Sequence, residues 1–208
     1  MTQMDDFEMV SDKDEKKSEN KDELALKVAI IGDLGVGKTT VINRYVEYTG
    51  PVRELQSKSF IFERRKVKLT FQDTCGSEQM SFVTSAFYQN AVTCIFLYDV
   101  SNKDSFARLN MWFDELVRYG PNKGIIPTVL CGNKCELEDK IDKEAKDAFL
   151  AKHPMKEYKI STVTGQGIDQ LFNDILPGAI GEAIRQLKSQ KKPIPPEIKE
   201  KGGCCSIQ

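Results

Sequence analysis

The stretch Gly32-Asp33-Leu34-Gly35-Val36-Gly37-Lys38-Thr39 matches the pattern G-x-x-x-x-G-K-[S/T] of a phosphate-binding loop. It follows an apolar run, Leu24 to Ile31, that predicts a buried strand, and it leads into a helical stretch, Thr40 to Tyr48. Glycines let successive backbone N–H groups surround a phosphate, and the helix N-terminus adds the positive end of its dipole. The sequence therefore predicts a nucleotide-binding loop rather than a glycine-rich turn with an exposed lysine.

Several side chains in and after this loop have predicted roles. Lys38 is expected to place its ammonium group against the β and γ phosphates, and the Thr39 hydroxyl to bind a Mg²⁺ ion between them. Asp73 follows a later apolar segment, where its carboxylate can hold the same ion through a water molecule. Gly76 can bring a backbone N–H group close to the γ phosphate.

The 208 residues give room for one α/β domain with a tail at each end. The net charge of −1 hides an uneven distribution, because residues 1–23 carry nine acidic and four basic side chains, and residues 185–201 carry six basic and two acidic ones. We expect an acidic, disordered N-terminal extension over 1–23, the nucleotide domain over 24–188 and a variable tail over 189–208.

The composition argues against secretion and against a membrane span. The chain has no apolar signal region and no run of about 18 apolar residues, so a cytoplasmic protein is expected. The six cysteines are expected to be reduced. Cys131 and Cys135 resemble half of a metal site, but no second pair stands at a suitable spacing, so zinc is not expected. We expect His153 to be a surface helix residue and Trp112 a core residue.

Apolar runs alternate with helical patterns along the rest of the chain. Further strands are predicted at 60–64, 67–72, 92–98, 126–131 and 158–161, and helices at 106–119, 145–152 and 168–187. The first two of these strands are expected to pair through Arg64-Arg65-Lys66, and Pro177-Gly178 to kink or divide the last helix. The predicted fold is α/β, a six-stranded, mainly parallel sheet with helices on both faces, which binds ligands at the carboxyl ends of its strands.

Five ordered motifs carry a resemblance to a known family. They are GDLGVGKT (32–39), DTCG (73–76) followed by Glu78, IFLYDVSNKDSF (95–106), CGNKCE (131–136) and the final GGCC (202–205). With these motifs the chain resembles a small GTPase of the Ras superfamily, and its Rab branch in particular. The resemblance implies a P-loop G domain that binds GTP or GDP with Mg²⁺ and hydrolyses GTP.

The resemblance also implies a guanine pocket. Asn133, Lys134 and Glu136 stand in place of the family's N-K-x-D, and the backbone of Ser161-Thr162-Val163 stands in place of its S-A-K segment. The acid accepts from guanine N1–H and the exocyclic amine, which adenine does not offer; Glu136 in place of Asp predicts guanine preference with weakened affinity. The residues expected to contact the nucleotide are Asp33, Leu34, Gly35, Val36, Gly37, Lys38, Thr39, Thr40, Gly76, Asn133, Lys134, Glu136, Ser161, Thr162 and Val163.

Two departures from the family bear on hydrolysis, for which the expected catalytic residues are Lys38, Gly76 and Ser77. Ser77 replaces the family's water-orienting glutamine, and its hydroxyl is too short to reach the attacking water. Leu34 stands where the family carries a small residue, and its bulk crowds the γ phosphate and an incoming arginine finger. We expect slow intrinsic hydrolysis; the alternative is that both changes are neutral because another group does this work.

The first switch is shortened, since Asp73 lies only 35 positions after Lys38. Thr49, Ser57 and Ser59 are candidates for the Mg²⁺-binding hydroxyl of this segment, and ungapped counting favours Ser57. The alternative is that no hydroxyl closes this side of the metal, which would blunt the difference between the GTP and GDP states.

The C-terminus predicts a lipid anchor. Cys205-Ser206-Ile207-Gln208 fits C-a-a-X, and Cys204 before it gives a double cysteine, so farnesyl and geranylgeranyl groups both stay open. Basic residues upstream are expected to meet anionic lipid rather than nucleic acid. They are Lys188, Lys191, Lys192, Lys199 and Lys201.

The resemblance implies a set of partners and a place in the cell. The partners are effector proteins, an exchange factor, a GTPase-activating protein and a prenyl-binding chaperone. The protein is expected on the cytoplasmic face of an intracellular membrane, with a cytosolic pool. Two other hypotheses are a GTP-locked or nucleotide-indifferent membrane-bound interaction module, and a P-loop kinase or ATPase, which would leave Asn133-Lys134 without a role.

Overall fold

Strand β2 (Leu24–Ile31) lies in the middle of the sheet, and its last four side chains are buried. Val28 and Ile30 belong to a core cluster shared with helices α1 (Lys38–Val46) and α6 (Ile168–Ser189). Ala29 and Ile31 belong to a second cluster, shared with helices on the other face. A strand that is buried on both faces is typical of a parallel sheet between two helical layers.

The computed structural model describes residues 8–9, 23–47, 56–73, 88, 90–121 and 126–189, with the backbone alone for residues 8, 9, 72 and 73. The remaining strands are β1 (Glu8–Met9), β3 (Ser57–Phe62), β4 (Arg65–Asp73), β5 (Ala91–Asp99), β6 (Thr128–Asn133) and β7 (Lys156–Lys159). The remaining helices are α3 (Lys103–Ala107), α4 (Leu109–Tyr119) and α5 (Lys143–Lys152).

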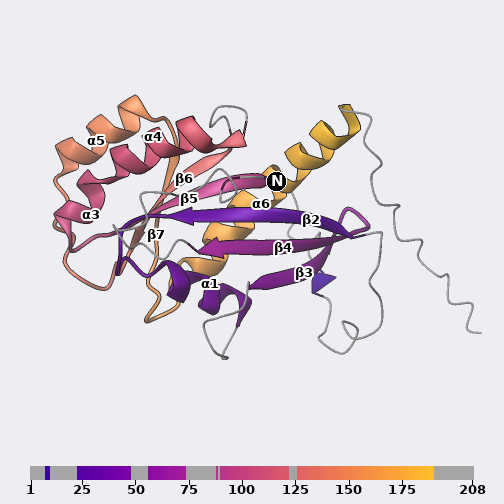
Figure 1. The fold of residues 1–208 in the computed structure, drawn as a ribbon. Coiled ribbons are helices and arrows are strands. Elements are labelled where there is room, and N and C mark those ends of the chain that lie inside the picture. Colours follow the sequence, from indigo (N-terminus) through magenta and orange to yellow (C-terminus); the bar gives the residue numbers. More distant parts are fainter. Residues whose placement is uncertain are drawn as a thin grey trace, which may run out of the picture.

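The strands form one sheet in the order β1-β3-β4-β2-β5-β6-β7. The pairs from β4 to β7 are parallel, whereas β3 with β4 and β1 with β3 are antiparallel. Helices α1 and α6 cover one face, and α3, α4 and α5 cover the other (Figure 1). The predicted α/β fold with six mainly parallel strands is confirmed, and β1 adds a seventh strand where the sequence predicted none.

Aromatic rings fill the layer between the sheet and helices α1 and α6. The Tyr45 and Phe172 rings stack with centroids 3.8 Å apart, and Phe71 meets both rings edge-on at 5.6 and 5.8 Å.

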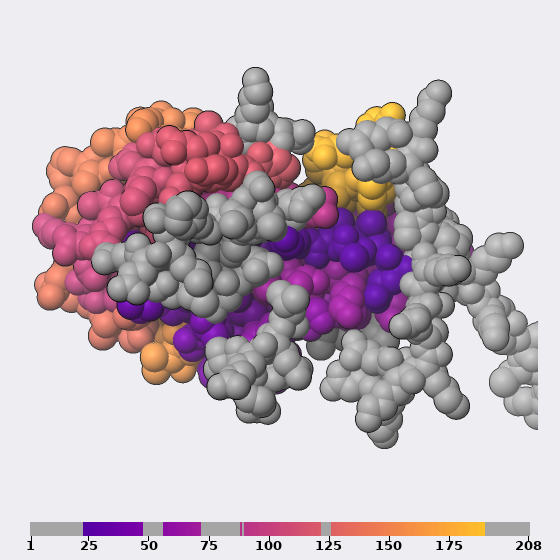
Figure 2. Space-filling view, in the orientation of Figure 1, coloured from indigo at the N-terminus to yellow at the C-terminus, as the bar shows by residue number. Residues whose placement is uncertain are grey.

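In the space-filling view, the residues of β2 to β4, indigo to purple, lie beside the pink and orange residues of the second helical layer (Figure 2). Of the helices that the structure describes, none is long and apolar enough to cross a membrane.

The helix predicted over 106–119 is in fact two helices. The Asn102 side chain accepts hydrogen bonds from the backbone N–H groups of Asp104 (3.0 Å) and Ser105 (3.4 Å), so α3 begins at Lys103. Arg108 separates α3 from α4. The cap satisfies N–H groups that a helix start would otherwise leave without partners, and it moves the helix start three residues before the predicted one.

The predicted hairpin is confirmed, but the position of its turn was wrong. The turn residues are Glu63 and Arg64, both in the left-handed conformation with φ of 45° and 61°, and Arg65 and Lys66 already belong to β4. Two consecutive left-handed residues give the tight turn that suits the twist of antiparallel strands. This register places Arg65 on the buried side of the hairpin.

Helix α6 continues through Pro177, so the division into two helices does not occur, and the alternative of a kink at the proline stays a prediction. Side chains on both sides of the proline are buried, among them Leu176 and Ile180, and their packing stabilises one continuous helix. The surface position predicted for His153 was also wrong. The residue is 7% exposed, and its ring centroid lies 3.8 Å from that of Phe113 and 4.9 Å from that of Phe149.

Candidate functional site

The loop between β2 and α1 is closed by its own lysine. Lys38 is buried, and its Nζ donates hydrogen bonds to the carbonyl oxygens of Gly32 (2.8 Å) and Asp33 (2.7 Å). The carboxyl end of β2 and the first turn of α1 therefore hold a positive charge between them. This arrangement suits an anion that replaces one of the two carbonyls as the partner of the ammonium group.

The glycines of the loop leave room for such an anion. Gly37 is left-handed with φ of 97°, and a β-carbon there would overlap the side-chain amide of Asn133. Gly35 has φ of 78°, and a β-carbon there would meet open space, so the backbone is accessible at this point. Within the described residues no side chain caps α1 at Gly37, and its first turn carries no acidic residue. These features fit a phosphate group.

Asn133 joins three segments that are far apart in the sequence. It ends β6 with its side chain fully buried, and its Nδ2 donates to the Val36 carbonyl oxygen (2.8 Å) and to Thr162 Oγ1 (3.4 Å). The backbone N–H of Thr162 donates back to Asn133 Oδ1 (3.2 Å). The structure thus brings the phosphate loop together with two segments that were predicted to bind the base.

Lys134 is held beside this junction by an acidic residue that the sequence analysis did not single out. Its backbone is left-handed with φ of 64°, and its Nζ lies 2.6 Å from Asp99 Oδ2. Asp99 also accepts from the backbone N–H (2.9 Å) and the hydroxyl (2.7 Å) of Ser101. Burial raises the pKa of Asp99, but the hydrogen bonds from Lys134 and Ser101 outweigh it and the pKa is lowered. The acidic residue directly after the apolar run 91–98 is the feature of the sequence that could have indicated this role of Asp99.

The other residues predicted for the base lie around Asn133. Ser161 is buried, and its Oγ accepts from the backbone N–H of Thr164 (3.0 Å). Its backbone N–H and carbonyl bond Gln166 and Gly165, which closes the loop 161–167 on itself. Val163 is 72% exposed, and the Glu136 side chain is exposed as well. The backbone of the loop 161–167 is therefore held by its own hydrogen bonds, whereas the Glu136 side chain is exposed at the surface.

Asp33 turns its carboxylate away from the loop. Trp112 Nε1 donates to Asp33 Oδ1 (3.1 Å), and Arg108 Nη1 lies 3.3 Å from Asp33 Oδ2. Asp33 is buried by these contacts, so only its backbone remains on the side of the loop. Trp112 is buried as predicted, but its role in holding the loop was missed. The acidic residue inside the phosphate loop could have indicated this role, because a buried carboxylate requires a cation or a hydrogen-bond donor nearby.

The remaining loop residues face outward. Leu34 is 70% exposed at the tip of the loop, Thr40 is exposed on the first turn of α1, and Thr39 between the loop and Thr40 is partly buried. Leu34 is therefore open to solvent at the tip of the loop.

The residues predicted for the metal are only partly brought together. Asp73 ends β4 in register with Ile30, two residues before Gly32, so its backbone lies beside the loop. Ser57 is exposed at the start of β3 and pairs with Thr70, which is level with Lys27. At about 3.3 Å per residue, Ser57 lies roughly 16 Å short of Gly32 along the strand direction. The register therefore does not bring Ser57 to the loop.

Four predicted residues and one alternative lie outside the described part of the chain. They are Gly76, Ser77, Cys204, Cys205 and the alternative metal ligand Thr49, and the tail residues Lys191, Lys192, Lys199 and Lys201, predicted to meet lipid, lie outside it as well.

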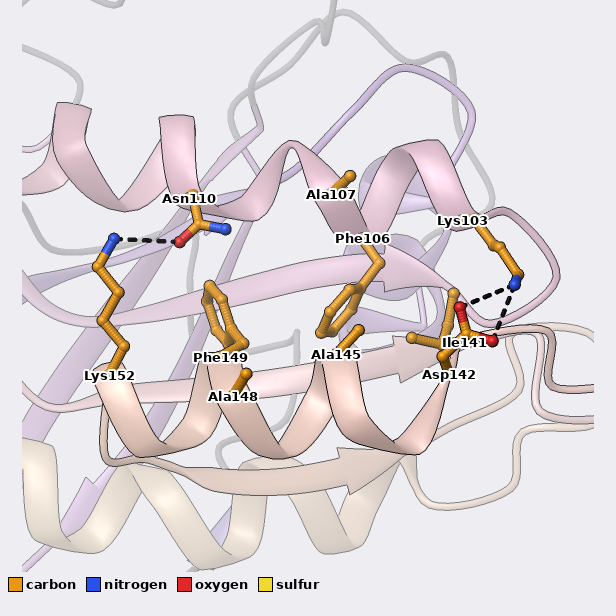
Figure 3. Close-up of a pocket in the computed structure, with 10 residues that line it drawn as sticks. All are labelled: Lys103, Phe106, Ala107, Asn110, Ile141, Asp142, Ala145, Ala148, Phe149 and Lys152. Carbon is orange, nitrogen blue, oxygen red and sulfur yellow. Dashed lines mark hydrogen bonds and ion pairs between the residues drawn. The ribbon is translucent and has the colours of Figure 1, made fainter.

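A separate groove of about 490 Å³ lies between helices α3 and α4 and helix α5, away from the loop. Phe106 and Phe149 form its apolar wall (Figure 3). The ion pair of Lys103 with Asp142 closes one end at 2.8 Å, and Lys152 donates to Asn110 (3.4 Å) at the other. None of the residues predicted to contact a nucleotide lines this groove.

Comparison with known proteins agrees with this geometry. The Ras family model matches residues 27–180. The chain is 30% identical over 197 residues to the Ras-related protein Rab-7b of Paramecium octaurelia, an alignment that covers 86% of this chain and 96% of that protein. It is 30% identical over 186 residues to the Ras-related protein Rab-13 of Bos taurus, covering 83% and 89% of the two chains.

A third relative is the Ras-related protein Rab-7a of Dictyostelium discoideum, 30% identical over 200 residues, with 89% of this chain and 98% of that protein covered. The family match, these relatives and the junction of the loop with Asn133 all point the same way. The chain belongs to the Ras superfamily and is a Rab-like small GTPase, a protein that binds guanine nucleotide and hydrolyses GTP.

Proposed function

We propose that this chain is a switch of membrane traffic that binds GTP or GDP with Mg²⁺ where the loop 32–39 meets the segments 133–136 and 161–163. The observation that carries the proposal is the contact of Asn133 Nδ2 with the Val36 carbonyl oxygen (2.8 Å). The side chain expected to read the base also fixes the loop expected to hold the phosphates. Base and phosphates are therefore bound by one rigid unit.

The phosphates would be held by the loop backbone and by Lys38. Its ammonium group is already positioned by two loop carbonyls, so its charge lies inside the loop before a nucleotide binds. The accessible backbone at Gly35 supplies room for the chain of phosphates. Asp33 does not oppose them, because its charge is compensated by Arg108 on the other side of the loop.

The base would be selected by Asn133 and Glu136, with the Lys134 stem over the rings and the backbone of Ser161, Thr162 and Val163 at guanine O6. The Glu136 side chain is exposed in this structure, so a bound guanine would have to fix a side chain that is free in solvent. That step and the extra methylene both lower affinity relative to an aspartate. We therefore propose guanine preference with weakened binding.

Mg²⁺ fits the donors at the phosphate end of the site. Thr39, on the first turn of α1, would bind it with its hydroxyl, and the carboxylate of Asp73, at the end of β4, would hold it through a water molecule. When bound, this ion neutralises charge on the β and γ phosphates. Ser57 has no place in this set, because the register keeps it away from the loop.

Intrinsic hydrolysis is proposed to be slow. Lys38 and the backbone N–H of Gly76 would stabilise charge on the γ phosphate, but Ser77 is too short to orient the attacking water. Leu34, exposed at the mouth of the site, would also hinder an arginine finger from a GTPase-activating protein. Both departures slow the return to the GDP state.

The switch would act on the cytoplasmic face of an intracellular membrane. Lipid on Cys204 and Cys205, together with the basic tail, would anchor it, and a prenyl-binding chaperone would maintain a cytosolic pool. Effectors would recognise residues near 49–59 and 73–85 once GTP orders them, and an exchange factor would reload the protein.

The test is single-turnover GTP hydrolysis by the purified chain, with its nucleotide content and its GDP, GTP and ATP affinities measured alongside. We expect bound guanine nucleotide, no measurable ATP binding and slow hydrolysis. Ser77→Gln is expected to raise the intrinsic rate at least about tenfold. Leu34→Gly is expected to raise the rate mainly when a GTPase-activating protein is present. A fast wild-type rate that neither change alters would contradict the proposal of slow hydrolysis.

The exposed Leu34 also supports a second candidate, a GTP-locked or nucleotide-indifferent interaction module on membranes. Pull-down of membrane-traffic proteins with the GDP-loaded and GTP-loaded chain separates the two. A switch retains partners only in the GTP form, whereas the module retains the same partners in both forms.

A further inference from the structure

The outer edge of β3 pairs with the chain's own N-terminal extension at Phe60 and Ile61. Strand β1 is the small indigo arrow beside β3 (Figure 1), and it pairs antiparallel, with Glu8 opposite Ile61 and Met9 opposite Phe60. The other side of β3 is taken by β4 along its whole length. An edge strand presents a row of N–H and C=O groups that can pair with any extended segment.

Charge favours an acidic segment at this edge. Residues 1–15 carry six acidic side chains and one basic one, whereas residues 58–68, which include the hairpin turn, carry five basic side chains and one acidic one. Outside residues 1–15, Glu23 at the end of the extension places its Oε1 3.2 Å from Lys66 Nζ of the hairpin. The extension and the hairpin are therefore complementary in charge as well as in backbone hydrogen bonding.

The pairing is short, and its connection is long enough to let it open. Among the described residues of the extension, Glu8 and Met9 join the ladder, and residues 10–23 separate them from β2 in the sequence. A tether of this length gives an effective concentration on the order of millimolar, so a weak contact suffices to keep the edge filled within one chain. A separate molecule must exceed that concentration or bind more tightly.

We infer that the outer edge of β3 is an interaction surface for an extended acidic strand, and that the segment around Glu8–Met9 is the strand that fills it within the same chain. A partner protein that pairs with this edge must first displace the extension. The extension thereby competes with that partner for the edge of β3. This competition does not involve the nucleotide or the loop 32–39.

Amide hydrogen exchange in the full chain tests this inference. In an antiparallel ladder the N–H of either Phe60 or Ile61 points to the outer edge, so both amides are followed. Met9→Pro removes an N–H from the extension and fixes its φ, and it is expected to speed exchange at the outward amide about tenfold. Ser18→Pro, nine residues after Met9 in the same extension, is the matched control and should leave both amides unchanged.

A synthetic peptide of residues 1–15 provides the second arm. Added to the Met9→Pro protein, it is expected to restore protection at the outward amide, and the same peptide with proline at position 9 is not. A tenfold rise in salt should weaken the protection, because the charges are exposed to solvent. The Val28 amide, buried in β2, reports whether each variant is folded.

Three results would overturn the inference. They are equal protection at Phe60 and Ile61 in the wild-type and Met9→Pro proteins, failure of the peptide to restore protection, and a wild-type chain that elutes as a dimer with the extensions exchanged between copies. None of these readouts depends on which nucleotide is bound, so they stand apart from the test of the proposed function.

Discussion

The indole nitrogen of Trp112 in α4 donates a 3.1 Å hydrogen bond to the carboxylate of Asp33 in the phosphate loop. The contact joins residues 79 positions apart in the sequence. It explains how an acidic residue is tolerated one position after Gly32. A carboxylate that pointed into the loop would repel phosphate, but this one is directed toward Trp112 and Arg108, and Arg108 compensates its charge at 3.3 Å.

Trp112→Phe should therefore weaken GDP binding and stability without leaving a large cavity in the core. Phenylalanine keeps an aromatic ring in the packing but leaves Asp33 Oδ1 without its donor. We expect a loss of about 1–2 kcal/mol in the free energy of unfolding, measured in urea, and a weaker affinity for GDP. Met111→Leu, at an exposed neighbouring position of α4, is the control and should change neither. Unchanged stability and affinity in Trp112→Phe would show that the hydrogen bond is dispensable.

Gly37→Ala is expected to disrupt the junction between the loop and Asn133. The left-handed backbone alone costs about 1–2 kcal/mol for alanine, and the added methyl group overlaps the Asn133 amide. The hydrogen bond from Asn133 to Val36 must then shift, so we expect GDP affinity to fall at least about tenfold by calorimetry.

Gly178→Ala gives the opposite result and serves as the control. Gly178 lies inside α6, and a β-carbon there would meet no atom within 4 Å. Alanine in a helix interior is more stable than glycine by about 0.5–1 kcal/mol, so this variant should unfold at higher temperature and bind GDP normally. A loss of GDP affinity in Gly178→Ala would mean that the loss in Gly37→Ala is not local.

Asp99→Asn should remove part of the acid sensitivity of folding. The folded pKa of Asp99 is lowered, because the hydrogen bonds from Lys134 and Ser101 outweigh burial, so its stabilisation is present above the unfolded pKa of about 3.9. It is lost as the pH falls through the folded value. The difference in unfolding free energy between wild type and Asp99→Asn should be roughly 1–3 kcal/mol near neutral pH and shrink below about pH 4.

The matched control for that series is Asp174→Asn. The Asp174 carboxylate also pairs with a lysine, at 2.7 Å from Lys156, but both side chains are more than a third exposed. Water screens such a pair, so its removal should change the unfolding free energy little at any pH. Equal effects of the two substitutions would contradict the argument from burial.

Local patterns in the sequence were enough to predict the main elements. Period and composition identified β2, the hairpin and α6, since each signal lies within a few residues. The position of the turn at Glu63–Arg64 was not predicted, because its two left-handed residues are neither glycine nor asparagine. Strand β1 escaped because two residues are too few to give a pattern, and only pairing with β3 makes them a strand.

The site was predictable where a motif carries it and not where tertiary contacts do. The meeting of the loop with Asn133 and Thr162 follows from motifs that end neighbouring strands. The roles of Trp112 and Asp99 depend on which side chain faces which across α4, the loop and β6, and a single sequence does not contain that information. His153 was misplaced for the same reason, because polarity along the chain does not reveal two phenylalanines beside it in space.

His153 provides the last prediction, a loss of stability in mild acid. Burial, and then the charge of Lys152, lower its pKa, and its Nε2 has no hydrogen-bond partner among the described residues. The unfolded chain therefore binds a proton near pH 6.5 that the folded chain resists, so unfolding becomes easier as the pH falls below that value. Burial raises the pKa of Glu115, so this residue makes folding more favourable, not less, as the pH falls. Glu115 is present in both the wild type and His153→Phe, so it does not affect their comparison. As His153 is the only histidine in the chain, His153→Phe should remove the loss between about pH 6.5 and 5 while keeping the ring against Phe113. Thermal unfolding of both proteins across that range decides the matter, and parallel curves would mean that the buried imidazole is not the group that titrates.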